Sequence, residues 1–300
     1  MKSFDEVLKI AKERGPKTIS IACAQDEDVL KAVENARVKG IANAILVGDA
    51  DKIKEIADTL NMDLGNYEVI DMKDAAEASI KAVELVSSGK AHIVMKGLVD
   101  TAIILKAVLN KEVGLRTGNV LSHVAVFDVA NFPRLLMVTD AAMNIAPDLK
   151  AKKQIIENSI IVGNALDIEV PKVAVICAKE KVNEKMPATV DAAELVKMNE
   201  NGELTGCLVG GPLALDLAVS EEAVRIKGFS NPVAGKADIL LCPTIEAGNV
   251  LYKSLSFLCD AKSAGIIVGA KAPIVLTSRA DNDETKLNSI ALGVLMAAKA

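Results

Sequence analysis

The chain has 300 residues, of which 51% are apolar and 25% charged, so its length suits about two domains and its composition supplies a buried core. A net charge of −5 and an aromatic content of 2% argue against nucleic acid as a partner, because such proteins use basic surfaces and stacking rings. No apolar run approaches the roughly 18 residues of a membrane-spanning helix, and the N-terminus lacks a signal-peptide core, so we expect a cytoplasmic protein with no membrane partner.

The first third of the chain alternates between amphipathic helices and short apolar strands. Helices are predicted at 2–14, 26–39, 52–60, 75–87 and 100–109, and strands at 18–24, 44–47, 67–71 and 91–95. Continuous apolar strands that alternate with helices are typical of a parallel sheet with both faces covered.

A polar link at 111–117 breaks this rhythm, and two strands at 124–127 and 135–138 follow it closely. Their connection is too short for a crossover helix, which predicts an antiparallel pair. Further strands are predicted at 173–177, 206–209, 237–242, 266–268 and 274–276, and helices at 148–165, 189–198 and 247–261, with another helical stretch ending at Arg225.

We therefore predict an α/β fold of two domains with mostly parallel sheets and an interdomain cleft. The chain returns to its first sheet near the end, so the first domain comprises 1–112 and 270–300 and the second comprises 113–269.

The last predicted strand is followed by a concentration of polar residues, namely Ser278, Arg279, Asp281, Asp283 and Glu284. In open α/β sheets, ligands bind just outside the carboxyl ends of strands. A hydroxyl, a fixed cation and nearby carboxylates placed there could bind an anion and move a proton. A capping box, with Asp281 as N-cap and Glu284 three residues later, is the alternative explanation for two of the acids. It does not explain Ser278 and Arg279.

Two other strand-to-helix junctions could also bind an anion, because helix N-termini favour negative charge. The first is Lys96-Gly97, ahead of a helix that contains Thr101. The second begins at Thr244, where the following helix carries Glu246, Asn249 and Lys253 at spacings of three and four residues. A helix cap with solvated charges remains the alternative for this second junction.

The glycine-containing loop at 228–236 resembles a Walker A loop only superficially. Its spacing is too long, and the residue after Lys236 is Ala237, which has no hydroxyl for Mg²⁺. No Gly-x-Gly-x-x-Gly pattern follows a strand, so a P-loop nucleotidase and a Rossmann dehydrogenase both fit poorly. The backbone N–H groups near Gly235, together with Lys236, could still hold an anion.

The remaining reactive residue types form no recognisable site. The two histidines, His92 and His123, lack a Ser-His-Asp arrangement; we expect His92 to be structural, while His123 could be structural or catalytic. The five cysteines form no Cys-x-x-Cys or Cys/His cluster and are expected to be buried thiols in a reducing compartment. We predict no metal site.

Three segments resemble the phosphate acetyltransferase/phosphate butyryltransferase family in the family's order, namely 231–238, 244–253 and 272–279. The similarity covers nearly the whole chain. The segments 111–118 and 122–127 and the ending Leu-Thr-Ser-Arg-Ala-Asp-x-x-Glu-Thr-Lys look like the butyryl branch. The resemblance implies the reaction acyl-CoA + phosphate ⇌ acyl phosphate + CoA, with butyryl as the expected acyl group and acetyl as the alternative.

The resemblance also implies an isocitrate/isopropylmalate dehydrogenase-like fold with the site in the cleft, a homo-oligomer, and small-molecule substrates (acyl-CoA and phosphate) without a covalently bound cofactor. A metal-dependent decarboxylating dehydrogenase on the same fold would need clustered aspartates and a nicotinamide loop, which the sequence lacks. A non-catalytic sensor of CoA or phosphate is a third hypothesis, which the Ser278-Arg279 pair and the nearby acids argue against.

The family's catalytic pattern matches this chain unevenly. Its Ser-Arg pair corresponds to Ser278 and Arg279. The acetyl branch has an aspartate, thought to deprotonate the CoA thiol, seven residues after that serine, where this chain has Thr285. A base must then come from the neighbouring acids, or no carboxylate base exists. A CoA-contacting arginine corresponds to Lys106 if a one-residue gap is allowed, which keeps the charge and loses the bidentate fork.

Overall fold

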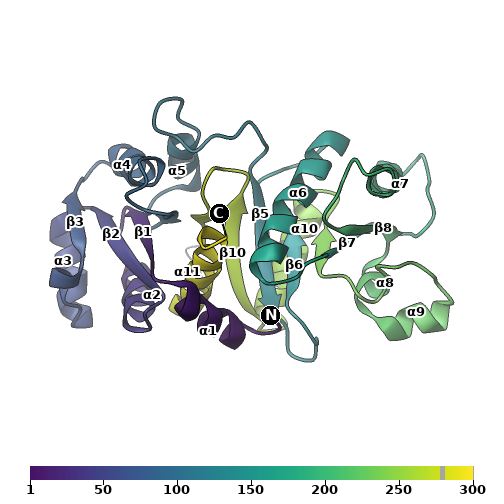
Figure 1. The fold of residues 1–300 in the computed structure, drawn as a ribbon, viewed down its shortest axis with the longest axis horizontal. Helices are drawn as coiled ribbons and strands as arrows, with labels where there is room; N and C mark the ends of the chain where they lie inside the picture. The colour runs from purple at the N-terminus through teal and green to yellow at the C-terminus, as the bar shows by residue number, and fades with distance from the viewer. Residues whose placement is uncertain (278–280, 300) are drawn as a thin grey trace. The chain divides into compact units, whose positions relative to one another are not determined.

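The computed structural model describes residues 1–277 and 281–299, which fold into two compact units (Figure 1). Unit 1 comprises Met1–Ser3 and Val120–Ser263, and unit 2 comprises Phe4–Asn119 and Ala264–Ala300. The segment 113–119, which the sequence analysis places with 113–269, belongs to unit 2. Backbone pairing explains this, since Arg116 forms a bridge with Ala270 and the Lys271 N–H donates to the Leu115 carbonyl at 2.8 Å.

Unit 2 is an α/β unit with helices on both faces of its sheet. Its strands are β1 (Lys17–Ala22), β2 (Ala42–Gly48), β3 (Glu68–Asp71), β4 (Ile93–Lys96), β11 (Ile274–Val275) and most of β10 (Lys262–Val268). Its helices are α1 (Phe4–Arg14), α2 (Glu27–Val38), α3 (Ala50–Leu60), α4 (Ala75–Ser87), α5 (Thr101–Val108) and α11 (Asp283–Ala297), with a 3₁₀ turn η1 (Leu64–Asn66).

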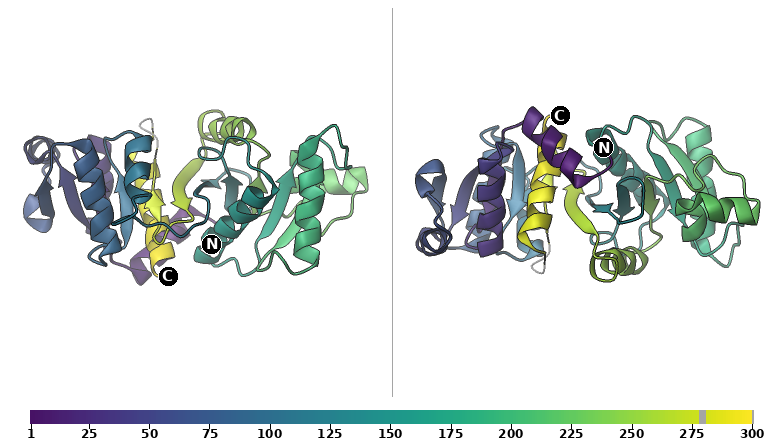
Figure 2. Two further views of the ribbon diagram at one scale, coloured as in Figure 1. Left: turned by 90° about the horizontal axis from the view of Figure 1, so that it is seen from above. Right: turned by 90° about the horizontal axis from the view of Figure 1, so that it is seen from below.

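The unit 2 strands lie in the order β3-β2-β1-β4-β11-β10, and every pair is parallel except β10 with β11. The views in Figures 1 and 2 agree that α4 and α5 cover one face, whereas α1, α2 and α11 pack together on the other. Aspartate is the N-cap of four of these α-helices, and in three of them the carboxylate, that of Asp26, Asp49 or Asp74, accepts a backbone N–H of the first turn. Helix α11 is buried from Lys286 to Met296, which fixes the position of its N-terminal turn.

Unit 1 is a second α/β unit with its own mostly parallel strands. These are β5 (Ser122–Asp128), β6 (Leu136–Thr139), β7 (Lys172–Ile176), β8 (Leu208–Leu213) and β9 (Ile239–Leu241), in the order β5-β6-β9-β7-β8. The antiparallel pairing predicted for the first two strands is confirmed, and the other pairs are parallel. Its helices are α6 (Leu149–Ala165), α7 (Pro187–Glu200), α8 (Leu215–Val219), α9 (Glu221–Lys227) and α10 (Ile245–Phe257).

Two glycines explain why β8 runs further than the strand predicted at 206–209. From the sequence we expect that strand to end before Gly210-Gly-Pro, yet these residues continue it to Leu213. A Cβ atom at Gly210 would lie 2.5 Å from the Asn231 Oδ1 atom, and one at Gly211 would lie 2.9 Å from the Val175 Cβ atom. The glycines therefore permit close packing within the strand, which is a tertiary requirement that local propensity does not reveal.

Candidate active site

The predicted corner at the end of β11 is partly outside the described residues, because Ser278 and Arg279 fall in the undescribed stretch. Strand β11 pairs with β4 so that Val275 lies opposite Met95, and the buried Thr277 follows at the carboxyl edge of the unit 2 sheet. The Lys96-Gly97 junction follows β4 at the same edge, as the sequence analysis requires for a ligand site.

The acids after the corner do not form the predicted capping box. Helix α11 has Asn282 as its N-cap, whose Oδ1 atom accepts the Thr285 N–H at 2.9 Å. Asp283 and Glu284 occupy the first turn, where negative charge is favourable, and Asp281 precedes the cap. The alternative explanation of Asp281 and Glu284 as a capping pair is therefore wrong, so capping does not remove them as candidate bases.

A buried lysine that the sequence analysis missed holds this segment in place. Lys286 is only 3% exposed, and its ammonium donates to the Asp281 carbonyl and lies 3.9 Å from the Asp28 carboxylate. A lysine on an otherwise apolar helix face is the sequence signal that could have identified it. Burial of a cation requires partners, so Lys286 ties the N-terminus of α11 to α2.

The Lys96-Gly97 junction is tightly built. Lys96 is 6% exposed, and its Nζ atom lies 3.3 Å from the Gly97 carbonyl oxygen. A Cβ atom at Gly97 would lie 2.2 Å from the Cys23 carbonyl oxygen, so only glycine fits beside β1. Burial, with help from Asp74, raises the pKa of the Cys23 thiol, and the Lys96 charge opposes the rise. A buried cation thus stands at the carboxyl edge of the sheet.

The helix after this junction carries the other two residues predicted there, Thr101 and Lys106. Helix α5 begins at Thr101, and its N-cap Asp100 makes no side-chain capping hydrogen bond. Lys106 is exposed in the last turn, where a cation is favourable. Thr101 and Lys106 therefore lie near opposite ends of a two-turn helix rather than in one cluster.

In unit 1, the second predicted junction opens α10. Thr244 is the N-cap, and Glu246 in the first turn is exposed. Hydrogen bonds from its own backbone N–H and from the Thr244 side chain lower the pKa of the Glu246 carboxyl. Glu246 therefore stays ionised and is a weak base, and it satisfies part of the helix terminus that was predicted to bind an anion.

Asn249 and Lys253 contact protein groups rather than converge on Glu246. The Asn249 amide donates to the Ala141 carbonyl at 3.2 Å. The Lys253 ammonium lies 5.3 Å from the centroid of the Tyr252 ring and 5.4 Å from that of Phe257. The Asn249 contact joins α10 to the segment after β6.

That segment contains a turn built on Asp140, which the sequence analysis missed. The Asp140 Oδ1 atom accepts the N–H groups of Ala142 and Met143 at 2.8 and 2.9 Å. Its Oδ2 atom accepts a hydrogen bond from the backbone N–H of His123 at 3.2 Å and another from the side-chain amide of Asn144 at 2.6 Å. An aspartate at a strand end with an asparagine four residues later was the available signal. These four hydrogen bonds tie the turn together, and it adjoins the carboxyl end of β9 through β6.

The loop at 228–236 lies elsewhere in unit 1. It precedes β9, whereas Thr244 follows β9, so Lys236 and Thr244 stand at opposite edges of the sheet. The loop is integrated into the fold, since the Gly235 N–H donates to the Leu217 carbonyl at 2.7 Å and Arg134 donates to the Gly235 carbonyl at 3.3 Å. Lys236 itself is exposed. The structure therefore does not bring Lys236 together with Thr244.

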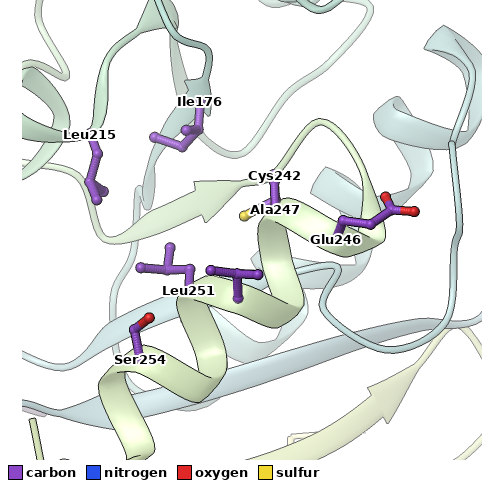
Figure 3. Close-up of a pocket in the computed structure, with 8 residues that line it drawn as sticks. Ile176, Leu215, Cys242, Glu246, Ala247, Leu251 and Ser254 are labelled. Atoms are coloured by element: carbon purple, nitrogen blue, oxygen red, sulfur yellow. The ribbon is translucent and has the colours of Figure 1, made fainter. Parts of the chain in front are cut away.

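An apolar cavity of about 490 Å³ adjoins α10 in unit 1 (Figure 3). Its lining residues come from α10, from the end of β7 and from the segments that follow β8 and β9, and they are Ile176, Leu215, Cys242, Glu246, Ala247, Val250, Leu251 and Ser254. Burial, with the charge of Asp140 adding to it, raises the pKa of the Cys242 thiol to about 12. This thiol is therefore protonated at neutral pH and unsuited to act as a nucleophile.

Among the described residues, the other reactive groups give no further site. Four cysteines are buried, whereas Cys259 is exposed, which corrects the expectation that all five are buried. His92 is exposed and accepts the Thr18 N–H at its Nδ1 atom. Within 1–277 and 281–299, no three His, Cys, Asp or Glu side chains gather as metal ligands. Over the same residues, every helix is too short or too polar to cross a membrane.

Comparison with known proteins links these features to one family. The model of the family described as phosphate acetyl/butaryl transferase matches residues 3–79 and 72–294. A phosphate butyryltransferase of Clostridium acetobutylicum is 56% identical over 297 residues, which cover 99% of each chain. A phosphate acetyltransferase of Thermotoga maritima is 45% identical over 98% of this chain and 99% of its own. The crystal structure of a branched-chain phosphotransacylase from Enterococcus faecalis superposes with a TM-score of 0.85 at 36% identity, over 94% of this chain and 99% of that one.

Proposed function

The chain belongs to the phosphate acetyl/butaryl transferase family, and we propose that it is a phosphate butyryltransferase that catalyses butanoyl-CoA + phosphate = butanoyl phosphate + CoA. The observation that carries the proposal is 56% identity to a phosphate butyryltransferase over 99% of both chains. Acetyl transfer is the second candidate, supported by the 45% identical phosphate acetyltransferase.

The proposed reaction is a direct transfer between two substrates bound together. A phosphate oxygen attacks the thioester carbonyl carbon, a tetrahedral intermediate forms, and its C–S bond breaks to release the CoA thiolate, which takes up a proton. We assign Ser278 and Arg279 to stabilise the negative oxygen of the intermediate. Loss of one such donor typically costs about 2.7–4 kcal/mol of transition-state stabilisation.

The reverse direction needs a base, because a thiol of pKa near 8.5 is only a few per cent ionised at neutral pH. Our candidates are Asp281, Asp283 and Glu284, since the N-cap of α11 is Asn282 and none of the three is needed for that role. Separate substitutions of the three acids with alanine test this assignment. A loss of kcat in one variant, greatest at low pH, identifies the base; normal kcat in all three means that no carboxylate here acts as one.

We propose two groups of substrate-binding residues, one in each unit. In unit 2, we assign Lys96, Gly97, Thr101 and Lys106 to CoA or phosphate, with the buried charge of Lys96 as the main attraction. In unit 1, we assign Thr244, Glu246, Asn249 and Lys253 to the same substrates, with the Asp140 turn as their support. Gly235 and Lys236 are weaker candidates, because they lie at the other edge of the sheet from Thr244.

The finer structural proposals rest on the family resemblance. They are an isocitrate/isopropylmalate dehydrogenase-like arrangement with substrates in an interdomain cleft, a homo-oligomer, and a cytoplasmic location. A crystal structure with bound CoA tests the first, and light scattering of the purified chain tests the second.

The decisive functional assay is thiol release from butyryl-CoA with and without phosphate. We expect release that depends on phosphate and stops when phosphate is omitted. Release that proceeds equally well without phosphate would instead indicate a thioester hydrolase. Butyryl-CoA that stays intact under both conditions would leave the non-catalytic sensor as the better hypothesis.

A further inference from the structure

We propose that the apolar cavity beside α10 is the pocket for the acyl chain of the CoA thioester, and that it accepts aliphatic chains of four carbons and longer, including branched ones. This inference rests on the proposed function, because it assigns a place to one part of that reaction's substrate. Beyond that function, the inference identifies the residues that determine acyl-chain selectivity.

The position of the cavity is that of a ligand site in an α/β sheet. Ile176 ends β7, Cys242 directly follows β9, and Leu215 begins the helix after β8. Three parallel strands thus contribute to the cavity at their carboxyl ends, where ligands bind in open sheets. The cavity also starts at the first turn of α10, which carries the candidate residues Thr244 and Glu246.

The chemistry of the lining selects the acyl chain among the parts of the substrates. Ala247 and Leu251 lie on the α10 side, and Ile176 and Leu215 lie across from them (Figure 3). Val250, also on α10, lines the same side. The Glu246 carboxylate is directed away from the apolar side chains (Figure 3). None of the described lining residues is a cation, so the cavity does not suit phosphate or the nucleotide part of CoA.

The pantetheine arm is also a poor fit, because its two amides and its hydroxyl need hydrogen-bond partners. The cavity offers few, since the Cys242 thiol is a weak partner and behaves as a small hydrophobic group. An aliphatic chain needs no polar partner, and its burial is favourable at about fourfold in affinity per methylene, equivalent to roughly 0.8 kcal/mol.

The size and openness of the cavity determine the chain lengths. A volume of about 490 Å³ is in the range that holds whole small molecules, so a three-carbon tail leaves part of it empty. Val250 is 66% exposed and Leu215 is 40% exposed, so the cavity lies open beside these side chains. Longer and branched chains can therefore extend past the butyryl terminus and cover exposed apolar surface.

The test fills the cavity with Ala247→Phe, at an exposed position where the substitution leaves the core untouched. Butyryl differs from acetyl by two methylenes, so the ratio of kcat/KM for butyryl-CoA to that for acetyl-CoA should fall about 15-fold. The kcat/KM for acetyl-CoA should fall less than that for butyryl-CoA, because acetyl has no tail to lose. Val250→Ala should lower kcat/KM for hexanoyl-CoA more than for butyryl-CoA.

The matched control is Ile226→Phe on α9, which adds the same ring at a position that is 73% exposed and outside the cavity. It should leave all ratios unchanged, and thermal unfolding of each variant checks that the fold is intact. An equal loss for acetyl-CoA and butyryl-CoA in Ala247→Phe would overturn the inference and assign the cavity to the pantetheine arm. An unchanged ratio with an altered oligomeric state would also overturn it, and would make the cavity an interface between copies of this chain.

A failure of the proposed function would look different. In that case the wild-type chain itself would show no phosphate-dependent release from any acyl-CoA, whatever the variants do.

Discussion

The contact between α10 and the Asp140 turn offers a sharp test of where the unit 1 part of the site lies. Gly248 is buried in α10, and a Cβ atom there would lie 2.2 Å from the Asp140 carbonyl oxygen and 3.0 Å from the Ala141 Cα atom. Both obstacles are backbone, and the Asp140 carboxylate holds this turn through four hydrogen bonds. In Gly248→Ala we therefore expect the helix to move rather than this hydrogen-bonded turn.

Helix α10 must move by about 1 Å to bring the new Cβ atom into ordinary van der Waals contact with the Asp140 carbonyl oxygen. Alanine gains about 1 kcal/mol over glycine in a helix, and overpacking costs about 1–3 kcal/mol, so the net loss of unfolding free energy should not exceed about 2 kcal/mol. Activity should suffer more, because a misplacement of about 1 Å in catalytic geometry can cost about 100-fold in rate. We therefore expect a folded enzyme with kcat/KM for butyryl-CoA reduced about 100-fold.

The assay combines steady-state thiol release with thermal unfolding, and Gly293→Ala in α11 is the matched control. A Cβ atom at Gly293 would lie 3.2 Å from a methyl group of Val275, which is a side chain that can adjust. This control should retain activity within about threefold. If Gly248→Ala keeps wild-type activity while folded, the first turn of α10 is not part of the catalytic geometry, and our reasoning about unit 1 is wrong.

Three further predictions concern the corner after β11 and the buried thiol. Arg279→Ala should reduce kcat by about 10²–10³-fold or more with an unchanged midpoint of thermal unfolding; near-normal kcat would remove Arg279 from the mechanism. Lys286→Met leaves the Asp281 carbonyl without its donor, so the free energy of unfolding should fall by about 1–3 kcal/mol in denaturant titrations, and no change would mean that the bond is unimportant. The Cys242 thiol has its pKa raised from 9.0 to about 12 in the folded chain, so the unfolded chain ionises first and stability should fall as pH rises from 9 to 12. Cys242→Ala should flatten that fall, whereas an identical pH profile would contradict the raised pKa.

Sequence periodicity predicted the alternation of strands and helices well, because the strands are short apolar runs between amphipathic helices. The antiparallel pair β5–β6 followed from the length of the connection alone. The extension of β8 through Gly210 was missed, since it depends on the close approach of Asn231 and Val175. Local propensity treats a Gly-Gly-Pro sequence as a turn, and only packing across the sheet shows otherwise.

The site shows the same division between local and tertiary information. The junctions at Lys96 and Thr244 follow from strand ends that precede helices, and the structure has both. The N-cap of α11 was placed one residue early, because aspartate and asparagine are almost equally good caps and Asp281 adjoins Asn282. The Asp140 turn is mostly local and was missed although Asp140 and Asn144 offered a signal. The apolar cavity could not be predicted, because its parts come together only when distant strands assemble.

The central claim is that the chain transfers a butyryl group from CoA to phosphate, and the most direct test is the identity of the product. Phosphorus NMR of the enzyme with butyryl-CoA and inorganic phosphate should show phosphate consumed and butyryl phosphate formed in equal amounts with free CoA. Release of CoA with butyrate as the product and phosphate unchanged would contradict the account.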